Sequence, residues 1–326
     1  MGSAPGPIRM DLDGNPLGPT EHVASTLAAG ASGRDEEALA TALREEVAIF
    51  AGVSARSIRL VQRIDELAAA WIARAGAEAP VIVFPPGGER IAIADSRRRV
   101  VVHRGPGFQP DIDPETASEL PTGAIAVLMS PHDPSGALTP AQDVVRLARA
   151  CDLVIVDQRH GGYSPRTLVP LAREFDNVVI LDTLETWGGL DAFPVGWAIG
   201  SPATLDRLGG VGTVPSGSLL AGLAVFEDLA NVRAAIRAVR DERSRMYRML
   251  RKLNLVQPLP SWANFMLVRV TRGDRDAIVS GLASRGILVH VPDGPGLERF
   301  IRISAGRPDD TDALRRALVE IAVGIA

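Results

Sequence analysis

The chain has 326 residues, a formal net charge of −4 at pH 7 and a hydrophobic share of 46%. This length and balance are typical of a soluble globular protein with one or two domains. The acidic balance argues against a general nucleic-acid binder, which needs a basic face. The single cysteine, Cys151, excludes an intramolecular disulfide framework and a metal site built from several cysteines.

Neither a membrane span nor a leader segment is predicted. No run of about 18 apolar residues occurs, and the first residues lack a basic region followed by an apolar stretch. We therefore expect a cytoplasmic protein without a membrane partner.

Short β-branched runs alternate with amphipathic stretches through the middle of the chain. The runs predict strands at Val81–Phe84, Val100–His103, Ala124–Met129, Leu153–Val156, Val178–Leu181 and Trp197–Ile199. Helices such as Ala141–Ala150 separate them. Near-continuous apolar strands with helices between them favour an α/β fold, with a mostly parallel central sheet covered on both faces.

A long Arg-rich helix is predicted from about Val232 to Lys252, and a small α+β domain follows it. The elements of that domain are strands at Phe265–Val270, Ile287–Val291 and Phe300–Ser304 and helices at Asp276–Arg285 and from about Asp309. We therefore predict an N-terminal arm at 1–30 that packs with the small domain, a large domain at 31–231 and a small domain at 232–326.

Three segments directly follow apolar strands and are rich in polar residues. They are Pro131–Gly136, Asp157–Tyr163 and Asp182–Leu190. Because ligands of open α/β sheets bind at the carboxyl ends of the strands, these segments are predicted to line the functional site.

Motifs spread over almost the whole chain resemble those of one enzyme family. They lie at Leu12–Pro19, Ser130–Gly136, Val156–His160, Thr183–Thr186, Val195–Trp197, Ser261–Phe265 and Ile301–Ser304. In order and spacing they are similar to the motifs of fold-type-I pyridoxal-phosphate (PLP) enzymes, in the histidinol-phosphate aminotransferase-like branch. The resemblance implies the class I/II aminotransferase fold and a homodimer with its sites at the subunit interface.

The resemblance also assigns the cofactor positions, and several carry unexpected residues. The lysine that forms the family's Schiff base matches Thr186, which cannot form an imine. Lys252 is the chain's only lysine, and it lies late in a polar helix. We therefore predict that PLP chemistry is lost and that the protein has no cofactor.

Further positions assigned by the resemblance support this prediction. The family's phosphate-binding residues match Arg63, Glu185 and Pro194, and its ring-stacking aromatic residue matches Gly87. We interpret Arg63 and Glu185 as a mutual ion pair that fills the phosphate cup, because a partly buried charge needs a partner. Of the ring contacts, only Asp157 is retained, where the family pairs a carboxylate with the pyridine nitrogen.

The vacated cleft is predicted to gather Asp133, Asp157 and His160 as catalytic groups, since close carboxylates and a histidine support acid–base chemistry. Arg302 matches the family's substrate-carboxylate arginine, whose planar fork suits a carboxylate. Asn15 and Asn264 are further candidates for substrate binding. These residues predict a PLP-independent enzyme of a biosynthetic pathway, acting on a small carboxylate or amino-acid-like ligand.

Other interpretations stay open. Asp157 could cap a local turn or bond backbone amides, and His160 could be a packed, hydrogen-bonded residue. Asp133 fits turn chemistry, and Arg302 could pair with an acidic residue such as Asp13. The ligand types of His132, Asp133, Asp157 and His160 suit a metal, but their spacing matches no known site, so we expect none. Alternative functions are a non-catalytic metabolite-binding or scaffold pseudoenzyme, non-covalent binding of PLP or its amine form, and ordinary PLP-dependent transamination.

Overall fold

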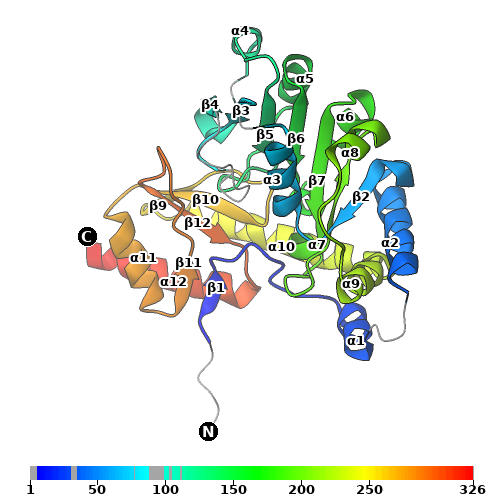
Figure 1. Ribbon diagram of the computed structural model, residues 1–326. Coiled ribbons are helices and arrows are strands. Elements are labelled where there is room, and N and C mark those ends of the chain that lie inside the picture. The colour runs from blue at the N-terminus through cyan, green and yellow to red at the C-terminus, as the bar shows by residue number, and fades with distance from the viewer. Residues whose placement is uncertain are drawn as a thin grey trace.

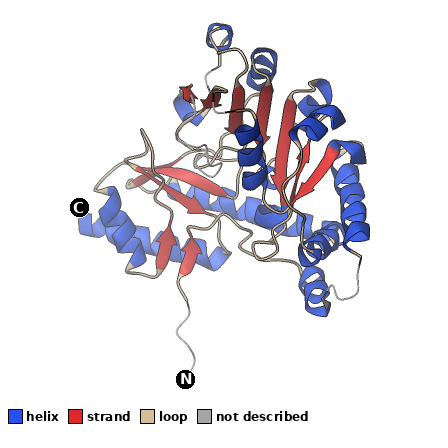
Figure 2. Cartoon of the chain, viewed as in Figure 1, coloured by secondary structure: helices blue, strands red, loops and turns tan. Residues whose placement is uncertain are grey.

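The computed structural model describes residues 6–30, 35–76, 78–87, 99–102, 105–110 and 112–325. Residue His103, at the end of one predicted strand, lies outside these ranges. In the described part, a large twisted sheet flanked by helices lies beside a smaller group of strands and helices that contains the C-terminus (Figures 1 and 2). The mostly parallel central sheet and its helical cover confirm the predicted α/β class.

The large sheet has seven strands in the order β2-β8-β7-β6-β5-β3-β4. Its neighbouring strands are parallel except at β8, which is antiparallel to both β7 and β2. The bounds are β2 Ile58–Val61, β3 Val81–Val83, β4 Arg99–Val101, β5 Ile125–Met129, β6 Leu153–Asp157, β7 Val178–Thr183 and β8 Gly196–Ile199. The sequence predicted every strand of this sheet except β2, with ends that differ by one or two residues.

Helices cover both faces of the large sheet, which explains why its strands are apolar throughout. In β5, Ile125 and Val127 join the core formed with α3 (Ile64–Arg74) and α8 (Pro202–Leu208). The intervening residues Ala126 and Leu128 join a larger core on the opposite face. That core includes α2, α5, α6 and α9, which span Glu36–Ala51, Ala141–Ala150, Val169–Glu174 and Ser216–Glu227.

Two smaller sheets complete the structure. Strands β9, β10 and β12 form an antiparallel sheet in the order β12-β10-β9, and β1 pairs in parallel with β11. Their bounds are β1 Ile8–Met10, β9 Val256–Pro258, β10 Phe265–Val270, β11 Ile287–Val289 and β12 Phe300–Ser304. The N-terminal segment therefore adds a strand beside the C-terminal part of the chain, while the exact domain boundaries stay a prediction.

The remaining helices connect these sheets. They are α1 Glu21–Ala29, α4 Pro114–Ser118, α7 Leu184–Trp187, α10 Leu229–Leu250, α11 Arg275–Ala283 and α12 Pro308–Ile325, with 3-10 turns η1 Ala55–Ser57, η2 Pro106–Phe108 and η3 Gly161–Tyr163. The long helix α10 contacts both α9 and the strands β9 and β10, and so links the two parts of the fold (Figure 1).

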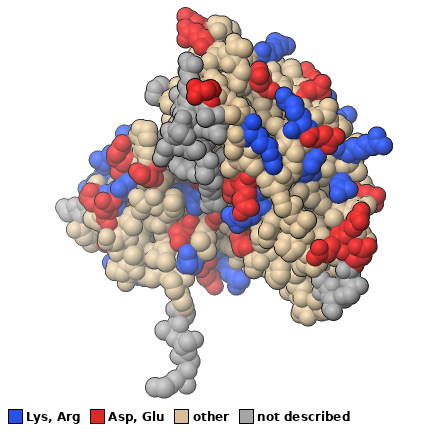
Figure 3. Space-filling model, in the orientation of Figure 1, with Lys and Arg blue, Asp and Glu red and all other residues tan. Residues whose placement is uncertain are grey.

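The described surface carries charges of both signs. Acidic and basic side chains are interspersed over the face seen in Figure 3. Among the described residues, no helix is long and apolar enough to cross a membrane.

Candidate functional site

The carboxyl ends of β5, β6 and β7 lie side by side. The three strands are parallel neighbours, and Met129 pairs with Asp157, which pairs in turn with Leu181. The three polar segments that follow these strands therefore meet at one edge of the sheet, as predicted from the rule for open α/β folds.

Asp157 ends β6 in a fully buried position, where its carboxylate is held by a neighbour in sequence. Its Oδ1 accepts a hydrogen bond from the backbone N–H of Arg159 at 2.9 Å. Its Oδ2 accepts from Arg159 Nε at 2.8 Å and from Nη2 at 2.6 Å. The open interpretation of Asp157 as a residue that bonds a local backbone amide is thus correct, and the same carboxylate also neutralises an arginine.

Arg159 connects this strand end to helix α3. Its guanidinium also donates to Asp65, which lies in the first turn of α3, 94 residues away in sequence. Burial by itself lowers the pKa of Arg159, but the charges of Asp157 and Asp65 outweigh it and raise the pKa above its ordinary value. Sequence reasoning gave Arg159 no role, although an arginine two residues after a buried strand-end aspartate was a usable signal.

Thr186 lies in the short helix α7, directly after β7, and only 5% of its surface is exposed. Its hydroxyl donates a hydrogen bond to the backbone carbonyl of Arg159, and its own carbonyl accepts one from the Tyr163 hydroxyl at 3.0 Å. Lys252 lies elsewhere, exposed just beyond the end of α10. Among the described residues, the strand-end site therefore contains no lysine side chain.

The residues predicted to fill a phosphate cup meet at the start of α3. Arg63 Nη1 lies 3.8 Å from Glu185 Oε2, the arrangement expected of a mutual pair. The Arg63 guanidinium also lies 3.8 Å from Asp65 and 3.7 Å from Glu66, so it forms ion pairs with three carboxylates. Burial raises the pKa of Glu185, and the nearby Arg63 partly opposes that shift. Pro194 lies in the loop that leads into β8.

Gly87 follows β3 in a backbone conformation with φ of +107°. A Cβ atom built there would lie 2.3 Å from the Asp133 carbonyl oxygen and 2.6 Å from His132 Nε2. The imidazole of His132 in turn contacts the Pro86 carbonyl at 2.6 Å and the Ser135 hydroxyl at 2.7 Å. Close packing of this turn explains why glycine stands at this position.

Arg302 reaches the same edge from β12. Its side chain is 3% exposed, and Nη1 donates to both oxygens of Asp133, at 2.9 and 3.0 Å. Nη2 donates to the Asp11 carbonyl at 2.9 Å, and the guanidinium lies 4.7 Å from the ring centre of Phe265. An internal ion pair for Arg302 was an open interpretation, but its partner is Asp133 and the suggested Asp13 is wrong.

His160 is fully buried beside the same ring, and its ring centre lies 4.9 Å from that of Phe265 in an edge-to-face arrangement. Polar atoms of His160, Asp13 and Asp133 all lie within 4.8 Å of one another. Of the four residues weighed as metal ligands, the structure thus brings together only Asp133 and His160, with Asp13 added. His132 faces Pro86 and Ser135, and Asp157 is occupied by Arg159.

The two asparagines predicted to bind substrate secure the N-terminal arm. Asn15 donates to the Trp187 carbonyl at 3.3 Å, and Asn264 donates to the carbonyls of Asp13 and Gly14 at 2.8 and 2.9 Å. Asn264 Oδ1 and Arg302 Nε are among the buried side-chain atoms that have no hydrogen-bond partner within the described ranges. An acceptor and a donor left open in this way point to a polar ligand, because unsatisfied buried groups are costly.

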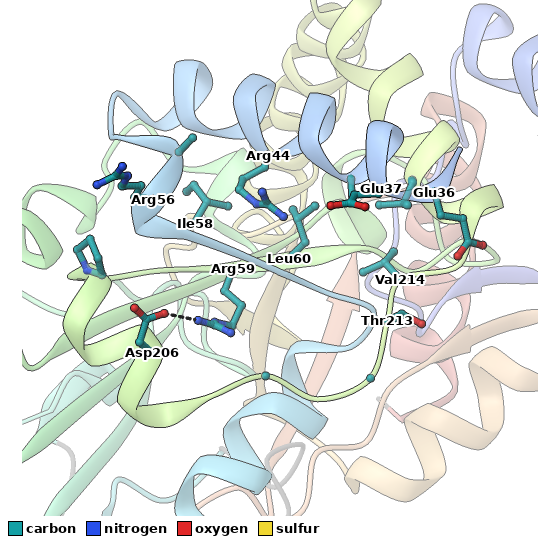
Figure 4. Close-up of a pocket in the computed structure, with 16 residues that line it drawn as sticks. Glu36, Glu37, Arg44, Arg56, Ile58, Arg59, Leu60, Asp206, Thr213 and Val214 are labelled. Carbon is teal, nitrogen blue, oxygen red and sulfur yellow. Dashed lines mark hydrogen bonds and ion pairs between the residues drawn. The ribbon is translucent and has the colours of Figure 1, made fainter. Parts of the chain in front are cut away.

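A separate open groove of about 920 Å³ lies between α2, β2 and α8. Arg44 extends into it from α2, and Arg59 extends from β2 to Asp206, with which it forms a 3.0 Å ion pair (Figure 4). None of the predicted site residues lines this groove.

Several aminotransferases are similar to this chain in sequence. A histidinol-phosphate aminotransferase of Chlorobium phaeovibrioides is 31% identical over 289 residues, which cover 85% of this chain and 79% of the relative. One of Dehalococcoides mccartyi is 29% identical over 232 residues, which cover 70% of this chain but only 65% of that protein, less than two thirds of its length.

Solved structures show the same fold. The histidinol-phosphate aminotransferase of Sinorhizobium meliloti in complex with pyridoxal-5'-phosphate has a TM-score of 0.83 at 24% identity, covering 98% of this chain and 91% of that one. A putative histidinol-phosphate aminotransferase from Erwinia carotovora reaches a TM-score of 0.87 at 22% identity, with 99% of both chains covered.

The comparisons contradict two predictions: that the protein has no cofactor, and that it is a degenerate, PLP-independent enzyme or a pseudoenzyme. The sequence relatives carry the name of an aminotransferase, and the Sinorhizobium structure contains PLP. The predictions depended on a few single positions, above all Thr186, whereas the similarity runs through most of the chain. Both predictions are therefore wrong.

A family model with the description "aminotransferase class I and II" matches residues 40–318. The matched span contains the whole large sheet, the strand-end network of Asp157 and Arg159, and the strand that carries Arg302. Together with the Chlorobium relative, this match extends over far more than half of the sequence. The chain belongs to the class I and II aminotransferase family.

Proposed function

We propose that the chain acts on an amino-acid-like substrate at the carboxyl ends of β5 to β7, as a PLP-dependent aminotransferase. The observation that carries this proposal is the 31% identity to a histidinol-phosphate aminotransferase over 85% of the chain. The unsatisfied Nε of Arg302 and Oδ1 of Asn264 support a polar ligand at this place. Asp133, Asp157 and His160 are its proposed proton-transfer groups.

PLP, when bound, supplies an electron sink for the carbon next to the substrate's amine. We further propose, from the resemblance, that Thr186 occupies the position of the family's lysine and that Arg63, Gly87, Glu185 and Pro194 occupy other cofactor positions. Since threonine has no amine, the present residues do not fit a covalent attachment at that position. PLP would instead be held without a covalent bond, and Asp157 would keep its pair with Arg159.

A homodimer is proposed on the same resemblance, since an isologous interface uses one surface patch of both copies. Equilibrium sedimentation of the full chain tests it. A mass of one chain at all concentrations would contradict it.

PLP binding and amino transfer test the function directly. We expect equilibrium dialysis to show retention of about one PLP per chain, and 2-oxoglutarate to be converted to glutamate with histidinol phosphate or an amino acid as donor. Arg302→Gln should lower kcat/KM by at least about tenfold, because a charge-assisted contact contributes about 1.5–3 kcal/mol.

Lys252→Arg is the matched control, because Lys252 lies outside the site, and it should change neither binding nor turnover. A PLP absorbance band that disappears in this variant would contradict non-covalent binding. Absence of both PLP retention and glutamate formation would overturn the proposed function.

A further inference from the structure

A cavity of about 260 Å³ lies next to the strand-end site. It is lined by Ser130, which directly follows β5, by Gln158, which directly follows β6, and by Trp262 from the segment before β10. None of the residues proposed above for proton transfer, substrate or cofactor is among its described lining residues. Since a water molecule occupies about 30 Å³ in the liquid, the cavity has room for a molecule of about nine non-hydrogen atoms.

Hydrogen bonds between neighbouring segments fix the walls of this cavity. The backbone N–H of Thr139 donates to the Ser130 hydroxyl at 3.1 Å. Gln158 is buried, donates through Nε2 to Thr167 Oγ1 at 3.2 Å, and accepts from the Leu168 N–H at 2.8 Å. The cavity is therefore formed before any ligand enters, which lowers the entropic cost of binding.

The cavity carries a positive charge that no carboxylate of the described chain neutralises. Arg166 lines it, and the Arg166 guanidinium forms no hydrogen bond or ion pair with a described residue. None of the described lining residues is acidic. A concave site with charge of one sign attracts a ligand of the opposite sign, and the planar fork of an arginine matches a carboxylate.

The aromatic part of the cavity is Trp262. This residue is 37% exposed, whereas Trp71, Trp187 and Trp197 are each 1% exposed. Its backbone N–H donates to the Gly136 carbonyl at 2.8 Å, which holds it at the cavity. An accessible indole favours a flat aromatic ring, because aromatic pairs gain stability beyond the area that they bury.

We infer that this cavity binds a small aromatic carboxylate, with the carboxylate at Arg166 and the ring against Trp262. The site is separate from the one at which the proposed aminotransferase reaction takes place. Binding there requires neither PLP nor turnover.

Titration calorimetry with benzoate and two matched compounds tests the inference on the full chain. We expect about one benzoate per chain, with a dissociation constant of about 1 mM or tighter. Benzamide has the same shape but no charge, and it should bind at least about tenfold more weakly. Cyclohexanecarboxylate keeps the charge on a saturated ring, and it should bind at least about threefold more weakly.

Two variants assign the binding to the cavity. Arg166→Gln should weaken benzoate binding by at least about tenfold, since it removes the charged donor. Trp262→Leu should abolish the preference for benzoate over cyclohexanecarboxylate. Arg173→Gln is the matched control, because Arg173 is an exposed arginine of α6 that does not line the cavity, and it should bind benzoate as the wild type does.

Tryptophan fluorescence gives a second measurement on the unmodified protein. Because the other three tryptophans are buried, quenching by acrylamide reports mainly on Trp262. Saturating benzoate should reduce this quenching, and Arg302→Gln should change neither the quenching nor the benzoate affinity.

Three results would overturn the inference: no benzoate binding to the wild type up to about 10 mM, equal affinity in the wild type and Arg166→Gln, or loss of binding in Arg302→Gln, which would place benzoate in the neighbouring cleft. PLP retention and glutamate formation are measured without benzoate. The proposed function therefore stands or fails independently of these results.

Discussion

At the scale of single residues, the most consequential contact is the buried pair of Asp157 and Arg159. The two side chains are 0% and 5% exposed, and the arginine is shared with Asp65. Charges removed from water need partners and saturated hydrogen bonds. The pair satisfies this need, and it also fixes the backbone between the end of β6 and the carbonyl that accepts the Thr186 hydroxyl.

Removing one member of this pair should be costly. We expect Arg159→Met to lower the free energy of unfolding by about 3–5 kcal/mol, because it leaves the Asp157 charge buried without compensation. Adding Asp157→Asn in the same chain should restore part of the loss. Urea denaturation measures both values.

Arg59→Met is the control for this experiment, since Arg59 pairs with an Asp206 that is 80% exposed. Its cost from the lost pair should be about 0–1 kcal/mol. An equal decrease in the free energy of unfolding for Arg59→Met and Arg159→Met would show that the buried pair contributes no more to stability than the exposed one.

At the scale of elements, burial on both faces made most strands predictable. Val154 and Ile155 of β6 join opposite cores, so no polar residue interrupts the run. Strand β2 was missed because Arg59 interrupts its short apolar run and because, as an edge strand, it is buried less completely. The antiparallel direction of β8 depends on pairing with distant strands, which periodicity does not reveal.

The segments that line the site could be predicted from the sequence, but the ion-pair partners within it could not. The three strand-end segments follow from the rule for open sheets. By contrast, the pairs Arg159–Asp65 and Arg302–Asp133 join residues 94 and 169 positions apart. Choosing such partners among the many charged residues needs the relative placement of α3 and β12, which local patterns do not contain.

Gly87 offers a test at this scale, because the turn after β3 packs against the turn after β5. Gly87→Ala should lower the free energy of unfolding by about 2–3 kcal/mol, since both the positive φ and the Asp133 carbonyl oppose a Cβ atom. Gly18→Ala is the matched control: its φ is +71° but nothing lies within 4 Å of the added atom. It should cost about 1–2 kcal/mol. Equal urea midpoints for both variants would contradict the packing argument.

At the scale of the whole molecule, the N-terminal arm connects the two larger sheets. Strand β1 pairs with β11, Asn264 holds the carbonyls of Asp13 and Gly14, and Asn15 contacts the carbonyl of Trp187 in α7. Arg243 of α10 supports the same junction through a hydrogen bond of 2.5 Å to the Ala263 carbonyl. The cleft residues are therefore placed by contacts that extend across the entire chain.

Stability of the whole molecule should depend on pH through its buried carboxyl groups. Burial raises the pKa of Asp182 to about 7, and burial also raises the pKa values of Glu185 and Asp191. A raised carboxyl pKa means that the folded state holds a proton that the unfolded chain releases near pH 4. The stabilisation is therefore complete below about pH 4 and is lost as pH rises towards 7.

Carboxylates nearer the surface act in the opposite direction at lower pH. A hydrogen bond from Arg9 lowers the pKa of Asp11, and one from Arg245 lowers that of Asp312, so their stabilisation is lost as pH falls below about 4. The two effects together predict a maximum of stability near pH 4–5, more acidic than for most proteins. Thermal unfolding followed between pH 3 and 8 measures this curve.

Asp182→Asn tests how much of the loss of stability between pH 4 and 7 comes from Asp182. Its amide keeps an oxygen that can accept the hydrogen bonds from the Thr183 N–H and Trp187 Nε1 but does not titrate. In the variant, the decrease in the free energy of unfolding between pH 4 and 7 should be smaller by about 1–3 kcal/mol. Each unit of pKa shift corresponds to about 1.4 kcal/mol, and the partial exposure of the side chain lowers this contribution. Asp206→Asn, at an 80% exposed side chain, should leave the curve unchanged.

A wild-type curve that stays level from pH 4 to 7, or an Asp182→Asn curve that falls as steeply as the wild type, would show that Asp182 ionises at its ordinary pKa. Its burial against Trp187 would then carry no energetic penalty.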